Sequence, residues 1–390
     1  MTYTIIQGDN KEVLKTIEDN SIDAIVTDPP YGIGFLGKDW DQDIGSLETY
    51  KECFRVLKPG GHILAFSAPR TYHHLALTIE KAGFEIRDQI MWIYSSGFPK
   101  SQDVGRSIDR SLKKGKFVKT GKTRVSGGPK ENPNGPLPRS EETIHVPESE
   151  EAKQWTGWGT SLKPAHEPIC MARKPLKQSI AKNCQQYGTG ALNIDATRIP
   201  TDDVIICGAG NGNTFNNFNA ENNIDGPGTG TKINHNVPKW QQADGGRFPS
   251  NVIGEITEEY QKYFYCPKVS RKERHIGHEM PSAMFGDKQG AYDDNGQRYA
   301  VGLDARTGNV GNNHPTVKPV ELMKYLIKLV TPKGGTVLDP FNGSGSTGMA
   351  AISLGYKYIG IELDEKYIAI SKQRIEAYTG SPFNNLFDYD

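Results

Sequence analysis

Short apolar runs alternate with amphipathic stretches in two blocks of the chain, one near each end. In the first block this pattern predicts strands over 4–6, 22–27, 62–67 and 84–94, and helices over 47–57 and 72–81. The second block predicts helices over 320–330, 349–354 and 365–378, and strands over 336–339 and 358–361. Such alternation is typical of an α/β fold with a mostly parallel sheet and right-handed crossovers. A complete sheet results only when the end of the chain is joined to its beginning, so we predict a circularly permuted strand order.

Asp28, Pro29, Pro30 and Tyr31 directly follow the apolar run 22–27, at the carboxyl end of a predicted strand. Ligands bind at this end of the strands in open α/β sheets. Because two consecutive prolines cannot continue the hydrogen-bond ladder, they form a rigid corner. A carboxylate, an outward-facing carbonyl and an aromatic ring at that corner can hold a base by its exocyclic amino group. The alternative is a solvated turn after a strand.

A glycine-rich turn follows the predicted strand over 336–339 and contains Gly343, Gly345 and Gly348. These glycines fit the dinucleotide-binding fingerprint, and Glu362 lies 19 residues after Gly343, close to the ~20 expected for a residue that binds ribose hydroxyls. A nicotinamide cofactor, and with it an oxidoreductase, is therefore one interpretation. A tight turn without a ligand is another.

Two residues of the same turn favour S-adenosylmethionine over a dinucleotide. Asp339 would place a negative charge near a pyrophosphate, whereas its carboxylate suits the cationic amino group of a methionine moiety. Phe341 can pack beside the sulfonium, where a cation–π interaction contributes about 0.5–2 kcal/mol.

With Asp28–Tyr31 as a catalytic motif and Asp339–Gly345 as a cofactor motif, the chain resembles the amino-group DNA methyltransferases of the β group. The resemblance implies a circularly permuted, Rossmann-like methyltransferase sheet that is mostly parallel, with an inserted DNA-recognition region. It also implies one antiparallel strand, for which 166–175 is the candidate, paired with the strand over 84–94.

The resemblance further implies S-adenosylmethionine as cofactor and a set of residues around it. The segment 314–319 matches the family's cofactor-capping sequence, so Thr316 and Lys318 are expected at the cofactor, with Lys318 facing the methionine carboxylate. A solvated lysine is the alternative for Lys318. In the permuted order Asp9 ends the strand that follows the Glu362 strand. It is a candidate for the cofactor's adenine amino group or, alternatively, a carboxylate at a helix start.

The reaction implied is methyl transfer from S-adenosylmethionine to the N6 amino group of a flipped adenine in double-stranded DNA. Asp28 and the Pro29 carbonyl would each accept one amino hydrogen, and Tyr31 would stack on the base. Relatives that methylate cytosine N4 more often have serine at position 28, so cytosine N4 is the alternative target. RNA is a further alternative substrate.

The remaining middle of the chain, 95–313, is not needed for the sheet. Lys+Arg and Asp+Glu are both 46, so net charge predicts nothing, but residues 100–139 hold 11 basic and 3 acidic residues. We expect a flexible arm that neutralises DNA phosphates, or alternatively a solvated loop. Aromatic and basic residues in 263–274 suit either DNA contact or a small core.

The predicted domains are the catalytic half (1–94), a basic flexible insertion (95–165), the antiparallel strand (166–175), a target-recognition region (176–313), the cofactor half (314–380) and a tail (381–390). Five cysteines without CxxC spacing indicate a reducing cytoplasm and no zinc site, and structural roles are expected for His166 and Glu167. No apolar run approaches ~18 residues, so no membrane contact is expected. A homodimer is compatible with the sequence, and any cognate restriction endonuclease would be a separate protein.

Overall fold

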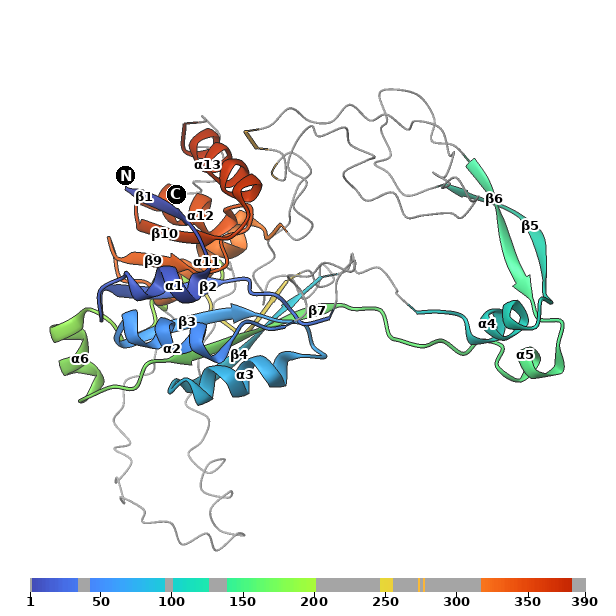
Figure 1. Cartoon of the computed structure of the whole chain (residues 1–390), viewed down its shortest axis with the longest axis horizontal. Helices are drawn as coiled ribbons and strands as arrows, with labels where there is room; N and C mark the ends of the chain where they lie inside the picture. Colours follow the sequence, from blue (N-terminus) through green and yellow to red (C-terminus); the bar gives the residue numbers. More distant parts are fainter. Residues whose placement is uncertain are drawn as a thin grey trace, which may run out of the picture. The chain divides into compact units, whose positions relative to one another are not determined.

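The computed structural model describes residues 2–33, 43–94, 101–125, 139–200, 246–254, 273, 276–277 and 317–380. Thr316 and the segment 263–272 lie outside these residues. The chain divides into two compact units, one formed by Met1–Ile93 with His166–Asp390 and the other by Tyr94–Ala165. Figure 1 traces both units by sequence colour.

Among the described residues, eight strands of the larger unit form one sheet. In spatial order they are β1 (Tyr3–Gln7), β10 (Lys357–Glu362), β9 (Thr336–Asp339), β2 (Ile22–Thr27), β3 (Leu57–Phe66), β7 (His166–Arg173), β4 (Glu85–Ile93) and β8 (Val252–Gly254). Within this described sheet β7 runs antiparallel to both of its neighbours, and the other pairs are parallel. The amino-terminal β1 lies against β10 from the other end of the chain (Figure 1). The predicted α/β class, the circular permutation and the antiparallel strand are therefore confirmed.

Helices cover both faces of this sheet. Their bounds are α1 (Asn10–Lys15), α2 (Leu47–Val56), α3 (Tyr72–Lys81), α6 (Ile180–Tyr187), η3 (Asp195–Thr197), α11 (Val320–Val330), α12 (Ser346–Ser353) and α13 (Glu365–Gly380). Side chains of a strand alternate between faces. Along β2, Ala24 and Val26 therefore join the core of α11 and α12, whereas Ile25 joins the core of α1, α2 and α3. Both faces of β2 are buried, which is why its sequence is mostly apolar; its buried Asp23 pairs with Lys58.

The sequence prediction missed β8 and α6. β8 has three residues at the edge of the sheet, too few to show a period, and α6 contains several polar side chains. Among the described residues, no helix has the length and apolar character needed to cross a membrane.

The smaller unit differs from the flexible arm expected from its composition. Its described elements are α4 (Val104–Ser111), β5 (Lys116–Val125), β6 (Arg139–Val146) and α5 (Glu150–Gln154), with β5 and β6 paired antiparallel. Buried Asp109 on α4 accepts hydrogen bonds from the Ser149 hydroxyl at 2.6 Å and from the backbone N–H of Glu148 at 2.9 Å. Burial raises the pKa of Asp109, but these hydrogen bonds outweigh it and lower that pKa to about 2. This buried carboxylate thus joins α4 to the residues that lead into α5, within a segment whose composition resembles that of a loop.

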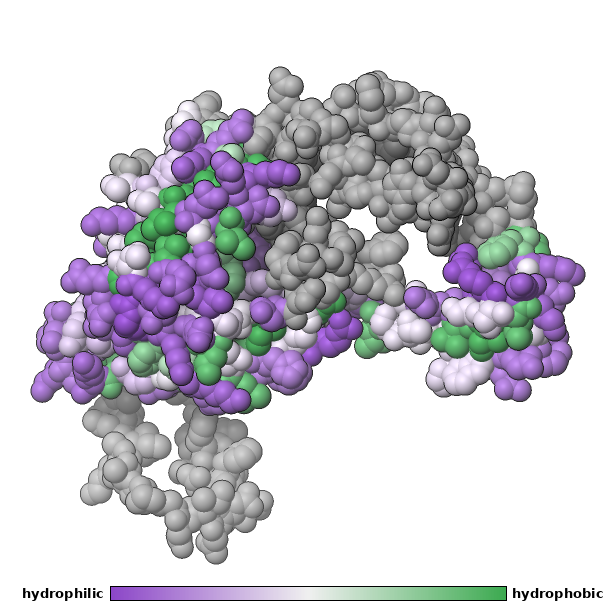
Figure 2. Space-filling view, viewed as in Figure 1, coloured by the Kyte–Doolittle hydropathy of each residue, from purple (hydrophilic) through white to green (hydrophobic). Residues whose placement is uncertain are grey.

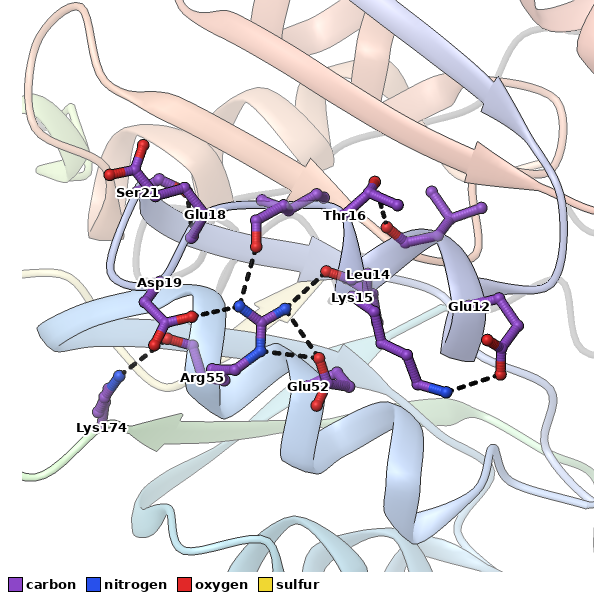
Figure 3. Close-up of polar contacts among 12 residues, drawn as sticks. Glu12, Leu14, Lys15, Thr16, Glu18, Asp19, Ser21, Glu52, Arg55 and Lys174 are labelled. Carbon is purple, nitrogen blue, oxygen red and sulfur yellow. Dashed lines mark hydrogen bonds and ion pairs between the residues drawn. The ribbon is translucent and has the colours of Figure 1, made fainter.

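Arg55, in the last turn of α2, ties that helix to the connection between α1 and β2 (Figure 3). Its guanidinium donates to the carbonyl oxygens of Leu14 at 2.7 Å and Ile17 at 2.9 Å. It also pairs with the carboxylates of Glu52 and Asp19. Because β2 leads directly into Asp28, this cluster fixes the start of the strand that carries the tetrapeptide.

We expect Arg55→Met to lower the free energy of unfolding by about 2–4 kcal/mol, because two carbonyl oxygens lose a charged donor. Arg55→Lys should restore only part of this loss, since an ammonium group lacks the planar fork. Urea unfolding followed by circular dichroism measures the change. Lys15→Ala is the control, because it removes an exposed pair with Glu12 and should have an effect below about 0.5 kcal/mol. Equal urea midpoints for Arg55→Met and Lys15→Ala would contradict the prediction.

Candidate active site

The two sequence motifs meet at the carboxyl edge of the sheet. β2 and β9 are parallel neighbours, with Ile25 opposite Leu338, so their carboxyl ends lie side by side. The Thr27 hydroxyl donates to Asp339 at 2.6 Å and joins two positions 312 residues apart in the chain. The tetrapeptide at Asp28 therefore stands next to the glycine-rich turn, as the predicted permutation requires.

Asp28 and Tyr31 belong to a compact polar cluster with Lys318 and Glu167. The Lys318 ammonium donates to Asp28 at 2.6 Å and to the Tyr31 hydroxyl at 3.0 Å, and it lies 3.3 Å from Glu167. The Tyr31 hydroxyl lies 2.9 Å from Asp28 and 2.7 Å from Glu167, so it bridges the two carboxylates. These four side chains form what we call the Asp28 cluster.

The elements explain how Glu167 and Lys318 reach this place. β7 is antiparallel, so it begins at the edge where its parallel neighbours end, and Glu167 is its second residue. Lys318 lies two residues before α11, and its side chain is only 6% exposed. The alternative of a solvated lysine is therefore wrong. Lys318 contacts Asp28 and Tyr31 of the tetrapeptide, and its predicted contact with a methionine carboxylate stays a prediction.

Burial and mutual contact set the charges in the Asp28 cluster. Burial raises the pKa of Asp28; the Lys318 ammonium opposes this rise and the Glu167 carboxylate adds to it. Burial alone would lower the pKa of Lys318, but the carboxylates of Asp28 and Glu167 raise it above its usual value. Burial and the same carboxylates raise the pKa of Tyr31 well above its usual value. Lys318 is thus a stable ammonium and Tyr31 a neutral hydroxyl at physiological pH.

Asp339 is the buried anchor of the glycine-rich turn. It accepts hydrogen bonds from the hydroxyls of Thr27 and Thr347 and, at 3.0 Å, from the backbone N–H of Phe341. Burial raises its pKa to about 6, although all three hydrogen bonds favour the charged form. Asp339 is also close enough to Asp28 for their charges to interact.

The glycine-rich turn needs backbone conformations that favour glycine, and Glu362 holds it in place through a hydrogen bond. Gly343 and Gly345 have φ angles of 50° and 79°, a region that favours glycine. Glu362 at the end of β10 accepts from the backbone N–H of Gly343 at 2.8 Å and of Asp364 at 3.0 Å. Burial raises the pKa of Glu362 against these hydrogen bonds. The predicted position of Glu362, at a strand tip beside the turn, is confirmed.

Asp9 and Phe341 lie at the borders of this region. Asp9 follows β1 and accepts from the backbone N–H of Lys11, so it caps α1, as its structural alternative predicted. Its side chain is exposed, and a contact with cofactor stays a prediction. Phe341 is half-buried, and its ring lies close to Gly45, just before α2.

Sequence reasoning missed Glu167, Thr27 and Thr347 as members of the site. The signal for Glu167 was present, because the first residues of an antiparallel strand must lie at the carboxyl edge of a parallel sheet. Among the described residues there is no group of three or more His, Cys, Asp or Glu side chains that could hold a metal ion.

Comparison with known proteins identifies a family model that matches most of this chain. A family model described as DNA methylase, N6_N4_Mtase, matches residues 22–373. The Type II methyltransferase M2.DpnII of Streptococcus pneumoniae is 31% identical over 149 residues, 38% of this chain and 53% of that protein. M.HpaI of Haemophilus parainfluenzae, also a Type II methyltransferase, is 23% identical across 100% of this chain and 78% of its own length. The crystal structure of an M1.HpyAVI–SAM complex covers 96% of this chain and 100% of that one, with 17% identity and a TM-score of 0.41. The chain spans about half the length of the first curated relatives that it matches, 53% of M2.DpnII and 52% of M2.LlaDCHI.

Proposed function

The chain belongs to the DNA methylase family whose model matches residues 22–373, and on this premise we propose that it methylates the N6 amino group of adenine in double-stranded DNA. The observation that carries the proposal is the hydrogen bond between Thr27 and Asp339, which holds the catalytic tetrapeptide against the glycine-rich turn. Neither motif alone requires the other, and their proximity supports the proposal of a base-binding corner beside a cofactor-binding turn. Family membership favours this proposal over a nicotinamide-dependent oxidoreductase.

The tetrapeptide has the groups that the reaction needs. The amino nitrogen of adenine is a poor nucleophile because its lone pair is delocalised into the ring. Asp28 and the Pro29 carbonyl, by accepting one amino hydrogen each, would favour a tetrahedral nitrogen whose lone pair points at the methyl donor. As the nitrogen–carbon bond forms and the carbon–sulfur bond breaks, the surplus amino proton would pass to Asp28. Pro30 would fix the corner, and Tyr31 would stack on the flipped base.

S-adenosylmethionine, when bound, would supply an electrophilic methyl group, and the glycine-rich turn fits it. We propose that Gly343 and Gly345 let the backbone approach the cofactor and that Glu362 accepts its ribose hydroxyls. Asp339 would face the methionine amino group, with Phe341 beside the sulfonium. Further contacts would come from Lys318, from Asp9 at the adenine, and from Thr316.

The affinity for S-adenosylmethionine should fall at acid pH. Protonation of Asp339 below about pH 6 removes the anion that would face the ligand's ammonium group. The dissociation constant should be constant above about pH 7 and approach a tenfold rise per pH unit below 6. Titration calorimetry between pH 5 and 8 measures it. Asp339→Asn should bind weakly with a flat profile, and a wild-type constant that does not change between pH 5 and 8 would contradict this role.

Nucleoside mass spectrometry of plasmid DNA from cells that express the chain tests the function. N6-methyladenine is the expected product, since position 28 is aspartate. N4-methylcytosine would keep the mechanism and replace the base. Neither modified nucleoside, in cells where the chain is present and binds S-adenosylmethionine, would refute DNA methylation and direct attention to RNA.

The smaller unit is our candidate for contact with the DNA backbone. Lys113, Lys114 and Lys116 are exposed there. Trp155 and Trp158 are 43% and 61% exposed, and their ring centroids lie 5.3 Å apart. Figure 2 shows that other, hydrophobic residues also reach the surface of this unit. Cationic and aromatic side chains together suit phosphate neutralisation and stacking.

Replacing Lys113, Lys114 and Lys116 by glutamine should weaken binding to duplexes of any sequence. It should also reduce the slope of log affinity against log salt by about one for each lost phosphate contact. Lys153→Gln is the matched control, because Lys153 already pairs with Glu150. Equal salt slopes for the triple variant and the control would exclude this surface.

The Type II names of the relatives support a restriction-modification setting, and we propose a cytoplasmic location with the endonuclease on a separate protein. DNA methylated by this chain should then resist that endonuclease at the same sites. A homodimer on DNA, also proposed, is tested by sedimentation with a duplex that carries the mapped site.

A further inference from the structure

The Lys318 ammonium lies where the proposed reaction needs a free acceptor. It donates to Asp28 Oδ2 at 2.6 Å, and the Tyr31 hydroxyl lies 2.9 Å from the other oxygen of Asp28. A charged donor binds a carboxylate more strongly than a neutral amino group does. An entering adenine could therefore make its full hydrogen bond to Asp28 only after Lys318 has moved.

Lys318 cannot leave the cluster without cost, because it is buried. Its ammonium lies 4.9 Å from the centre of the Phe66 ring and 5.3 Å from that of Tyr31, and its side chain is only 6% exposed. A buried ammonium needs a carboxylate or an equivalent acceptor nearby. Any movement away from Asp28 must end at another anion.

Besides the methionine carboxylate that the family resemblance assigns to Lys318, the structure offers Glu167 as that anion. Among the described residues, the carboxylates paired with Lys318 are those of Asp28 and Glu167. The Glu167 oxygen that accepts from Tyr31 at 2.7 Å already lies 3.3 Å from the ammonium, so a small movement completes the contact. Glu167 is carried by β7, whose first residues pair with β4 through Ile93 and Trp92, so its backbone is fixed.

We propose that Glu167 is a positioning residue. When the target amino group binds, the Lys318 ammonium leaves Asp28 and pairs with Glu167, so that Asp28 is free to accept a hydrogen bond from the base. The proposal rests on the proposed function. With two carboxylates and one ammonium, the Asp28 cluster keeps Lys318 paired both before and after this exchange. Replacing Glu167 by glutamine removes the second anion and leaves Lys318 held at Asp28.

The test compares two duplexes that carry adenine or purine at the target position of the site mapped by sequencing methylated DNA. Purine lacks the 6-amino group, so the ratio of the two dissociation constants reports the contact with Asp28. The same pair of duplexes is used for every variant, so the different pairing strengths of the two bases cancel between variants. Binding is measured with S-adenosylhomocysteine present, and no catalysis is needed.

Wild-type protein should prefer adenine, and Glu167→Gln should reduce that preference about tenfold, the factor that corresponds to 1.4 kcal/mol. Glu167→Asp, which keeps the charge, should retain part of it. In the Lys318→Met background, Glu167→Gln should have no further effect, because the competing ammonium is gone. Thermal melting confirms that each variant is folded.

An unchanged ratio in Glu167→Gln would overturn the proposal. So would an equal loss with and without Lys318, since that result would give Glu167 a purely structural role. Absence of methylated DNA with the unmodified chain is a separate outcome, because it refutes the proposed function on which the exchange rests.

Discussion

Replacement of Asp28 by alanine is expected to reduce methyl transfer by about 100- to 1,000-fold, the range for loss of one positioned group that stabilises developing charge. The physical reason is the loss of the acceptor that holds one amino hydrogen and receives the surplus proton. Lys318 keeps Glu167 as a partner in this variant, so the buried ammonium is not left unpaired. Single-turnover assays with labelled S-adenosylmethionine measure the rate of the chemical step.

Two comparisons make this result specific to chemistry. The affinity for S-adenosylmethionine, measured by calorimetry, should be nearly unchanged, because Asp339 and Glu362 hold their own turn independently of Asp28. Glu12→Ala, which removes an exposed carboxylate on α1, should methylate like the wild type. Undiminished methyl transfer by Asp28→Ala would exclude the proposed role of the tetrapeptide.

The sheet could be predicted from the sequence because each of its inner strands is buried on both faces. The run from Ile22 to Thr27 is mostly apolar and buried throughout, and two prolines follow it closely, so the observed β2 has the predicted bounds. The positions of Asp28 and Asp339 followed from the strand ends. The permuted order required only that the alternation of strands and helices be continued from one end of the chain to the other.

The interior of the site could not be predicted in the same way, because it depends on contacts between distant elements. The strand direction could have placed Glu167 at this edge, but its contact with Lys318, which lies just before α11, is not encoded near either residue. Family resemblance predicted Lys318 at the cofactor, and that contact stays a prediction; its observed partners are Asp28, Tyr31 and Glu167. In the smaller unit, the composition likewise carries no sign of the contact between buried Asp109 and Ser149 or of the pairing of β5 with β6.

Arg374→Met should both destabilise the fold and weaken cofactor binding, because Arg374 on α13 holds the glycine-rich turn through hydrogen bonds to Ser344. The guanidinium is fully buried in α13 and donates to the Ser344 carbonyl at 2.6 Å and to the Ser344 hydroxyl at 2.9 Å. At Gly345, an added Cβ would lie 2.7 Å from Ser371 of the same helix, so the turn is pressed against α13. Removing the guanidinium leaves a buried carbonyl without this donor and creates a cavity, for a loss of about 3 kcal/mol in the free energy of unfolding.

The affinity for S-adenosylmethionine, measured while the variant is folded, separates this role from a general loss of stability. At temperatures where Arg374→Met is still folded, its dissociation constant for S-adenosylmethionine should rise at least about tenfold, the equivalent of 1.4 kcal/mol. This follows because the turn must be ordered by the ligand instead of by the protein. Lys372→Met on the same helix is the matched control, since Lys372 is exposed and should change neither quantity. A variant that melts at a lower temperature but binds the cofactor as tightly as the wild type would limit Arg374 to stabilising α13, and the turn would then owe its shape to Asp339 and Glu362 alone.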